Sequence, residues 1–407
     1  MSVLGIIEKL LDGFEVEWKK FDDVGVFLRG KRFVKADMKS EGVPCIHYGE
    51  MYTHFGVHAK EAKSFLDESV ASKLRVANPG DVVIVAAGET IEDIGNGTAW
   101  LGESDIVFHD ACFSFKSSLD PKYVSYYLRT NLFKEQIRRS VSSGKISSIN
   151  AKGLGKATIP IPCPDNPEKS LAIQAEIVRI LDAFTAMTAE LTAELNMRKK
   201  QYNYYRDQLL SFDLSADQAG EGEVEWKTLG DLAENLDSKR KPITSGLREA
   251  GEIPYYGASG IVDYVKDYIF DGDYLLVSED GANLLARNTP IAFSISGKTW
   301  VNNHAHVLKF ETYAERKYVE YYLNSIDLTP YISGAAQPKL NKKNLGSIKI
   351  PNPAPKEKER IVAILDKFDS LTCSIKEGLP REIELRQKQY EYYRDLLLSF
   401  PKSDEAA

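Results

Sequence analysis

The chain has 407 residues and a formal net charge of −7 at pH 7, with 43% hydrophobic and 27% charged residues. This composition is typical of soluble globular proteins and excludes collagen-like or wholly disordered chains. At about 100–200 residues per domain, the length predicts two to four folding units and excludes a single small domain. The four cysteines form no Cys-x-x-Cys pair, which argues against a disulfide framework and against a structural zinc site.

The apolar stretches are short. The longest, such as residues 82–87, fall far below the roughly 20 residues that a membrane-spanning helix needs, and the N-terminus lacks the apolar core of a signal peptide. We therefore expect a cytoplasmic protein with no membrane partner. The negative net charge does not exclude a polyanion as partner, because binding depends on local patches of charge.

Several elements are predicted before residue 165. Val16-Glu-Trp-Lys19 reads as a strand with Trp18 as a core anchor, the β-branched run at 82–85 predicts another strand, and residues 123–128 predict a short helix. Residues 138–158 follow as a Ser- and Gly-rich loop with five basic and no acidic side chains. A proline-rich segment at 159–164 then closes the first globular region.

A long helix is predicted from Pro167 to Phe212. Pro167 suits the first helical turn, and Asp165 or Asn166 is the expected cap. At about 1.5 Å per residue this helix would be roughly 70 Å long, which indicates a spacer rather than a core helix. A heptad register with steps of four and three defines a coiled-coil seam. The seam positions are Ile177, Leu181, Phe184, Thr188, Leu191, Leu195, Arg198, Tyr202, Tyr205, Leu209 and Phe212.

The second half of the chain repeats this order. Val224-Glu-Trp-Lys227 repeats the opening motif, residues 274–277 and 291–295 predict strands, and residues 318–323 predict a helix. Residues 386–400 match residues 198–212 at twelve of fifteen positions, so the chain is a tandem repeat.

The repeat predicts the fold class. We expect two similar α/β domains separated by two long helices, which pair with each other as an antiparallel coiled coil. The second helix should kink or break at Gly378-Leu-Pro380, because glycine and proline both interrupt helices.

No pattern for catalysis emerges. Gly297-Lys-Thr299 resembles the end of a phosphate-binding loop, but Ala292 stands where that motif needs glycine. No Pro-Pro dipeptide of an adenine methyltransferase loop occurs, and Cys163 belongs to the proline-rich segment. The histidine pairs 54/58 and 304/306 lack a third ligand cluster, so we interpret them as satisfied or surface histidines rather than metal ligands.

Basic residues indicate a different function. The segment 331–350 matches the loop at 138–158 in place and is also free of acidic residues. Two such loops in an acidic protein are the electrostatic footprint of polyphosphate binding, with Asn, Gln and Ser available for base edges; the alternative is a pair of solvated polar loops. The residues expected near DNA are Lys145, Ser147, Asn150 and Lys152 in the first loop and Gln337, Lys339, Asn341, Lys342 and Lys343 in the second.

Two further basic clusters, one near the front of each repeat, fit either phosphate contact or ordinary solvated surface. They are Arg29, Lys31 and Arg32, and Lys239, Arg240 and Lys241.

One segment carries a specific resemblance. The repeated tetrapeptide at 188–191 and 192–195, Thr-Ala-Glu-Leu, followed by Asn-Met-Arg-Lys-Lys-Gln-Tyr-Asn-Tyr-Tyr-Arg-Asp207, resembles the central conserved region of type IC specificity subunits of type I restriction-modification enzymes. The resemblance covers essentially the whole chain. It implies two target-recognition domains, each reading one half of an asymmetric interrupted DNA target, and a spacer whose length depends on the number of tetrapeptide repeats.

The resemblance also implies the partners. Two methyltransferase subunits, which methylate adenine with S-adenosylmethionine, would bind the helical regions, and restriction subunits that translocate DNA with ATP and Mg would join them. This chain itself would be non-catalytic and hold no cofactor. We expect the methyltransferase contacts around one tyrosine- and arginine-rich motif in each helical region, although these tyrosines fit the intramolecular seam equally well. The motif residues are Tyr202, Tyr205, Arg206, Tyr390, Tyr393 and Arg394.

The predicted organisation is a recognition domain at 14–160, a helical spacer at 161–213, a second recognition domain at 222–351 and a C-terminal helix at 352–400. Two alternatives remain at this point. One is a self-sufficient nuclease or methyltransferase, and the other is a coiled-coil scaffold that assembles proteins without reading DNA bases. Charge reversal at Lys339, Lys342 and Lys343 separates the scaffold from the DNA-binding subunit, because a scaffold would keep its function.

Overall fold

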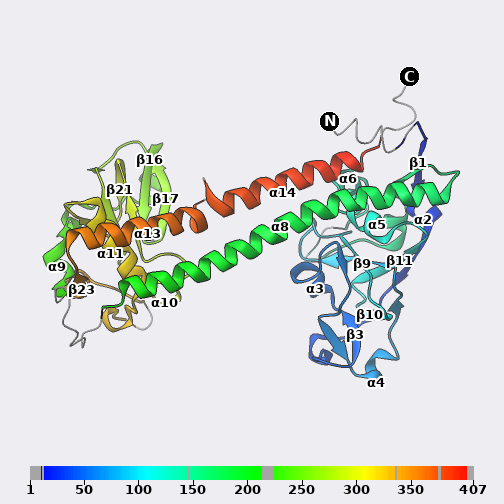
Figure 1. The fold of residues 1–407 in the computed structure, drawn as a ribbon, viewed down its shortest axis with the longest axis horizontal. Helices are drawn as coiled ribbons and strands as arrows, with labels where there is room; N and C mark the ends of the chain where they lie inside the picture. The colour runs from blue at the N-terminus through cyan, green and yellow to red at the C-terminus, as the bar shows by residue number, and fades with distance from the viewer. Residues whose placement is uncertain are drawn as a thin grey trace. The chain divides into compact units, whose positions relative to one another are not determined.

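The computed structural model describes residues 11, 13–142, 144, 146–212, 224–334, 337–374 and 377–400 (Figure 1). The chain divides into two units, the first made of residues 1–191 and 382–407 and the second of residues 192–381. Each unit therefore combines one globular domain with parts of the long helices. The expected boundary residues 213 and 222 lie outside the described residues.

Two sheets form most of the domain in the first unit. Their strand orders are β5-β3-β10-β6 and β2-β11-β7-β9-β4, and neighbouring strands are antiparallel except in the pairs β3 with β10 and β4 with β9. The strands are β1 (Val16–Lys20), β2 (Gly25–Arg29), β3 (Val43–Ile46), β4 (His58–Ala59), β5 (Ser64–Leu66), β6 (Val76–Ala77), β7 (Val82–Val85), β8 (Ala87–Gly88), β9 (Gly97–Trp100), β10 (Ile106–Phe108), β11 (Cys112–Ser117), β12 (Ser147–Ser148) and β13 (Thr158–Pro162). The short helices are α2 (Phe21–Val24), η1 (Lys35–Asp37), α3 (Tyr48–Thr53), α4 (Glu68–Ala71), α5 (Pro121–Tyr127), α6 (Asn131–Arg138) and α7 (Ala151–Gly155).

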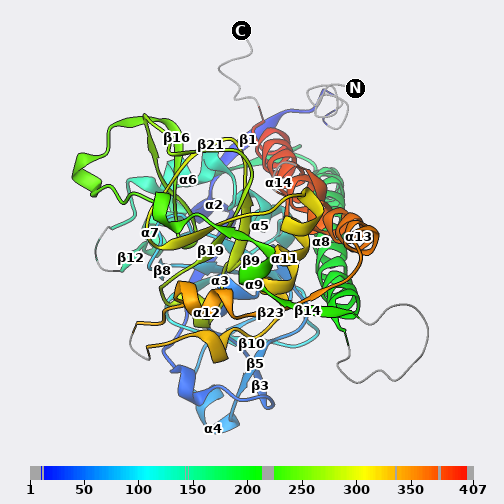
Figure 2. The same cartoon turned by 90° about the vertical axis from the view of Figure 1, so that its left-hand side faces the viewer.

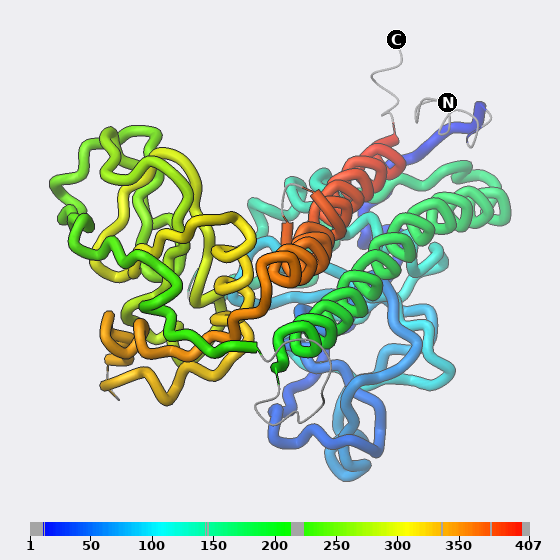
Figure 3. Tube along the Cα trace, turned by 60° about the vertical axis from the view of Figure 1, so that its left-hand side comes forward, coloured from blue at the N-terminus to red at the C-terminus, as the bar shows by residue number. Residues whose placement is uncertain are grey.

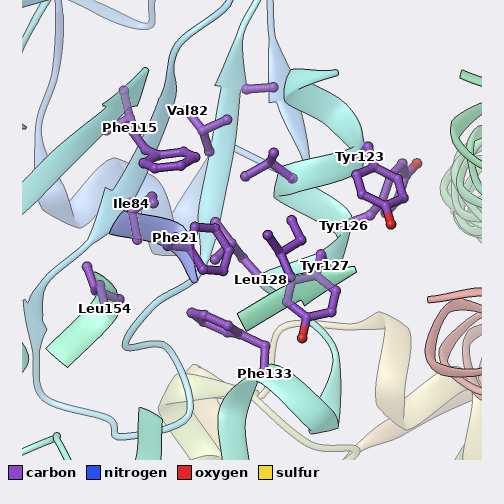
Figure 4. Packing of buried hydrophobic residues seen from close by; sticks show 14 of the residues in the cluster. Phe21, Val82, Ile84, Phe115, Tyr123, Tyr126, Tyr127, Leu128, Phe133 and Leu154 are labelled. Carbon is purple, nitrogen blue, oxygen red and sulfur yellow. The ribbon is translucent and has the colours of Figure 1, made fainter. Parts of the chain in front are cut away.

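Aromatic rings fill the core of this domain (Figure 4). Phe21 lies edge-on to Phe115 and Phe133, with ring centroids 5.2 and 5.7 Å apart. All residues of β7 are buried, which agrees with a short continuous apolar run in a covered strand. The predicted strand at 82–85 and the predicted helix around 123–128 are confirmed as β7 and α5.

The domain of the second unit has related sheets of its own, ordered β15-β22-β19-β20 and β17-β16-β21-β18 (Figure 2). The predicted strands at 274–277 and 291–295 and the predicted helix at 318–323 are confirmed as β19, β20 and α11. The strands are β14 (Glu225–Thr228), β15 (Glu234–Asn235), β16 (Ala250–Gly257), β17 (Gly260–Val265), β18 (Phe270–Asp271), β19 (Tyr274–Ser278), β20 (Ala292–Ile295), β21 (Lys298–Val301), β22 (Ala305–Lys309) and β23 (Lys349–Asn352). The shorter helices are α9 (Leu229–Leu232), η2 (Asp237–Lys239), η3 (Ser245–Leu247), α10 (Asn283–Ala286), α11 (Tyr313–Ser325), η4 (Thr329–Tyr331) and α12 (Lys342–Gly346).

The repeated sequence motifs meet in the same way in both units. Trp18 of β1 pairs with Pro160 of β13, and Trp226 of β14 pairs with Pro351 of β23. Both tryptophans pack against a hydrophobic core, as predicted. The Val-Glu-Trp-Lys motif and the proline-rich segment therefore form one two-stranded antiparallel sheet in each unit. The paired residues are far apart in sequence, 142 positions for Trp18 and Pro160 and 125 positions for Trp226 and Pro351.

The predicted long helix is confirmed as α8 (Pro167–Leu210), a single helix of 44 residues. Asn166 is the cap, because its side-chain oxygen accepts a hydrogen bond of 3.1 Å from the amide of Lys169.

In each unit, a buried tyrosine of the globular domain donates a hydrogen bond to an aspartate of a long helix. The Tyr126 hydroxyl donates to Asp182 at 2.7 Å, and the Tyr321 hydroxyl donates to Asp366 at 2.6 Å. These contacts join two tripeptides that recur in both repeats, Tyr-Tyr-Leu at 126–128 and 321–323 and Ile-Leu-Asp at 180–182 and 364–366.

Two successive helices, α13 (Pro355–Cys373) and α14 (Gly378–Leu397), form the C-terminal helical region (Figure 3). The predicted break at Gly378 is confirmed. Gly378 has a φ of +78°, and a Cβ at this position would lie 2.4 Å from the carbonyl oxygen of Ser370. Any other residue would therefore force these backbone segments apart.

The predicted pairing of the long helices is consistent with contacts inside each unit. In the first unit, Phe184 of α8 stacks on Tyr393 of α14 with centroids 5.1 Å apart. In the second unit, Tyr205 of α8 stacks on Phe368 of α13 at 5.7 Å. Each unit thus contains one stacked aromatic pair between α8 and the C-terminal helical region, at positions of the predicted seam.

Candidate nucleic-acid interface

The first basic loop ends in a capped helical turn. The side-chain oxygen of Asn150 accepts a hydrogen bond of 2.9 Å from the amide of Gly153 and so begins α7. The amide of Ile149, one residue earlier, binds the carbonyl of Ala86 directly after β7. The start of α7 is therefore fixed to the end of a buried strand, which holds the loop in a defined place.

The predicted DNA-binding residues of this loop differ in their exposure to solvent. Asn150 and Lys152 are exposed, whereas Ser147 is buried and pairs through its backbone with Gly88 in the sheet β12-β8. The side chain of Ser147 thus belongs to the support of the loop. Lys145 lies outside the described residues.

The second basic loop has the same construction. The side-chain oxygen of Asn341 accepts a hydrogen bond of 3.0 Å from the amide of Asn344 and begins α12, and the preceding amide of Leu340 binds the carbonyl of Glu279 at 2.7 Å. Lys342 and Lys343 are exposed in the first turn of α12. The two loops predicted from charge alone are therefore equivalent in backbone architecture as well.

Gln337 and Lys339, the remaining predicted residues of this loop, are exposed. The ammonium group of Lys339 also contacts a carboxylate oxygen of Glu279 at 3.2 Å. Lys339 and Ser333 exchange two backbone hydrogen bonds of 2.8 Å, which close the loop on itself. Lys339 consequently has both a surface position and a structural contact.

A buried network of charged side chains lies below this loop. Arg240 donates to Glu279 at 2.6 Å and to the carbonyl of Ala305 at 2.8 Å, so it lies inside the domain rather than on the surface that we expected for it. The ring of His306 contacts Asp237 at 2.6 Å. Burial pushes the pKa of the Asp237 carboxyl upward, but contacts with His306 and hydrogen bonds from Val307 and Asn235 together hold this pKa below its ordinary value.

Asp237, Glu279 and His306 are close enough for their ligand atoms to surround a metal ion. Their chemistry favours another arrangement, because Arg240 and Lys339 already supply positive charge to Glu279, and both ring nitrogens of His306 face hydrogen-bond acceptors. His306 is thus a satisfied core histidine, as predicted. His304 is exposed and contacts Asp280 at 2.9 Å.

The predicted partner-binding tyrosines occupy the helix seam. Tyr202 and Tyr205 contact Phe368 in the second unit. In the first unit, Tyr390 is buried against Tyr126, and Tyr393 stacks on Phe184. Of the two alternatives for these residues, the intramolecular seam is therefore observed.

The neighbouring tyrosines are more exposed than those in the seam, and sequence reasoning missed them. Tyr204 and Tyr392 occupy equivalent positions in the two motifs and are 62% and 63% exposed. The heptad register contained the signal, because Tyr204 falls between the seam positions Tyr202 and Tyr205 and must point away from the partner helix.

A cavity of about 1150 Å³ opens in the first unit between the domain and α14. Arg129, Lys134 and Arg394 line it together with apolar side chains. Burial, together with the charges of Arg129 and Arg394, lowers the pKa of the Lys134 ammonium to about 7 against the opposing effect of Asp93. The cavity wall is therefore a place where positive charges are crowded.

Comparisons with known proteins place the chain in a family. The family described as "Type I restriction modification DNA specificity domain" matches residues 15–198 and 221–385, which is one match for each repeat. The chain belongs to the family of type I restriction-modification specificity subunits. Members of this family are non-catalytic DNA-recognition subunits that function in a complex with other subunits.

Relatives and solved structures match over nearly the full length. The EcoR124I/EcoR124II specificity subunit of Escherichia coli is 39% identical over 432 aligned residues, with 99% of each chain covered. The EcoprrI specificity subunit of Escherichia coli is 34% identical, with 93% of each chain covered. The crystal structure of an S subunit from M. genitalium has a TM-score of 0.56 at 17% identity and covers 96% of this chain and 97% of its own, which supports the fold.

The described residues contain no helix that is both long and apolar enough to cross a membrane. The recognition of the family from the repeated motifs is thus confirmed, as is the non-catalytic role. The assignment to the type IC branch stays a prediction.

Proposed function

We propose that this chain binds a bipartite, asymmetric DNA target and directs adenine methylation or restriction by its partner subunits. The observation that carries this proposal is the repeated basic loop. Each domain presents a capped turn, α7 or α12, tethered to the end of a buried strand, and each turn carries exposed lysine; the capping Asn150 is exposed and the capping Asn341 is half-buried. Lysines supply phosphate contacts and the amide side chains supply hydrogen bonds to base edges.

The difference between the two loops supports an asymmetric target. Asn150 and Lys152 stand in the first loop, whereas Gln337, Asn341, Lys342 and Lys343 stand in the second. Base reading depends on which hydrogen-bond donors and acceptors a loop presents. The two loops share one backbone arrangement but carry different side chains, which favours two half-sites of different base sequence.

The partners follow from the proposed family role. Two methyltransferase subunits, which hold S-adenosylmethionine, would dock on the helical regions, and restriction subunits using ATP and Mg would join this core in the cytoplasm. Arg206 and Arg394 flank the seam in the two motifs, and we include the exposed Tyr204 and Tyr392 in the docking surface because aromatic side chains are enriched in such interfaces.

Methylome sequencing tests the recognition role directly. A host that carries this chain with its cognate methyltransferase is compared with the same host lacking this chain. We expect a new methyladenine mark at a two-part asymmetric motif with a spacer of constant length. A mark that persists without this chain, or no motif despite an assembled complex, would contradict the proposal.

Charge reversal separates DNA recognition from a scaffold role. We expect Lys342→Glu with Lys343→Glu to abolish the methylation mark while the complex still assembles, because phosphate contacts are lost. Lys339 is left unchanged, since its contact with Glu279 also supports the fold. Lys298→Glu with Lys309→Glu is the matched control, because both residues are exposed strand lysines outside segment 331–350. A scaffold would keep its function with either pair.

A further inference from the structure

His306 is buried at the centre of the second domain and has two well-defined ring contacts. It lies in β22 opposite Val277 of β19. Its Nε2 donates to the carbonyl oxygen of Leu340 at 2.7 Å, and its Nδ1 lies 2.6 Å from a carboxylate oxygen of Asp237. A carbonyl oxygen only accepts hydrogen bonds, so Nε2 carries a proton and donates it to Leu340.

The groups facing His306 come from three elements. Asp237 of η2 contacts its Nδ1, and Glu279, which follows β19, lies 3.8 Å from the same nitrogen. Arg240 bridges these two carboxylates at 3.5 and 2.6 Å, and Lys339 of the basic loop contacts Glu279. Arg240 and Lys339 therefore both supply positive charge to Glu279, and the charge-assisted hydrogen bond from Arg240 in this shielded site is among the stronger kinds in proteins.

Leu340 connects this network to the proposed DNA-reading surface. Its carbonyl accepts from His306, and its amide binds the backbone of Glu279. The next residue, Asn341, caps α12, which carries Lys342 and Lys343 in its first turn. The hydrogen bond from His306 thus fixes the backbone directly before the turn that presents these side chains.

We propose that His306 is a positioning residue that holds the second basic loop in its base-reading position through the Leu340 carbonyl. This inference rests on the proposed function, because it assumes that the loop reads DNA. His306 does not touch DNA itself; it acts through the loop. Loss of its hydrogen bond displaces α12 and weakens discrimination at one half-site.

The first domain offers an internal comparison. Cys112 of β11 pairs with Val85 in the register that His306 and Val277 occupy in the second domain. Burial raises the pKa of the Cys112 thiol to about 12, so this side chain stays neutral. The first loop keeps the backbone bond from Ile149 to Ala86 but has a thiol where the second has the imidazole of His306. The two half-sites should therefore respond differently.

The test uses the assembled methyltransferase complex with the full chain. Methylation rates are compared among duplexes that carry the correct target, a base change in one half-site, or a base change in the other. We expect His306→Gln to lower discrimination at one half-site about tenfold, the size of a lost buried hydrogen bond, and to leave the other unchanged. His304→Gln is the matched control, because His304 is an exposed histidine two residues away.

The same rates separate a displaced loop from a general loss of stability. Unfolding of the second unit would lower the methylation rate on every duplex, whereas displacement of α12 changes the ratio between the correct duplex and the duplex altered in one half-site. Unchanged discrimination in His306→Gln, or an equal loss at both half-sites, would overturn the inference. An unmodified complex that discriminates at neither half-site would instead reject the proposed function itself.

Discussion

Lys134 lines the cavity of the first unit together with other positively charged side chains. It donates to the carbonyl of Ile94 and to the side chain of Asn96, both at 2.7 Å, while Arg129 and Arg394 line the same cavity. Burial and these neighbours disfavour the charged ammonium, so its pKa falls to about 7. The unfolded chain restores an ordinary lysine pKa of about 10.4.

This difference predicts a pH dependence of stability. Between about pH 7 and pH 10 the unfolded chain binds a proton that the folded chain lacks, so the free energy of unfolding should rise with pH by up to about 1 kcal/mol per pH unit. Below pH 7 both states hold the proton, so Lys134 no longer makes the free energy of unfolding depend on pH. We expect Lys134→Met to remove the rise, because methionine does not titrate.

Urea unfolding followed by tryptophan fluorescence measures this effect. Replacing Trp226 and Trp300 by phenylalanine confines the emission to Trp18 and Trp100 of the first unit. The control is Lys60→Met, because Lys60 is exposed and its curve should parallel that of the unmodified chain. A Lys134→Met curve that keeps the same slope between pH 7 and pH 10 would contradict the prediction.

At the scale of elements, local sequence patterns were reliable where the structure is local. Heptad spacing and the Pro167 start predicted α8 to within two residues of its end at Leu210, and Gly378 marked the helix break. The repeated motifs also predicted which segments are equivalent. These features follow from backbone preferences and from periodic burial, both of which are written in neighbouring residues.

The candidate site was predictable only in outline. Charge composition located both loops, but their capped turns depend on single Asn side chains that sequence reasoning assigned to DNA. The network around His306 joins residues 69 and 34 positions apart, and Ser147 is buried by pairing with Gly88. Such long-range contacts leave no periodic signal in one sequence, so the network could not be foreseen.

At the scale of the whole molecule, α8 contributes residues to both units as one continuous helix. The Thr-Ala-Glu-Leu copies at 188–191 and 192–195 fall on either side of the division between the units. A change in the number of copies therefore changes the helix length between the two recognition domains without touching either basic loop. The spacer of the DNA target should depend on this segment alone.

Insertion of one further Thr-Ala-Glu-Leu copy after Leu195 tests this dependence. Four helical residues add about 6 Å and turn the chain by about 40° beyond one full turn, close to the ~34–36° per base pair of DNA. We expect methylome sequencing to show the same two half-sites with a spacer longer by one base pair. A Glu-Ala-Ala-Lys insertion at the same place should act alike if helix length sets the spacer. Three inserted residues, about 60° short of a full turn, should abolish the mark. An unchanged spacer in the four-residue variant would show that α8 does not determine the separation of the half-sites.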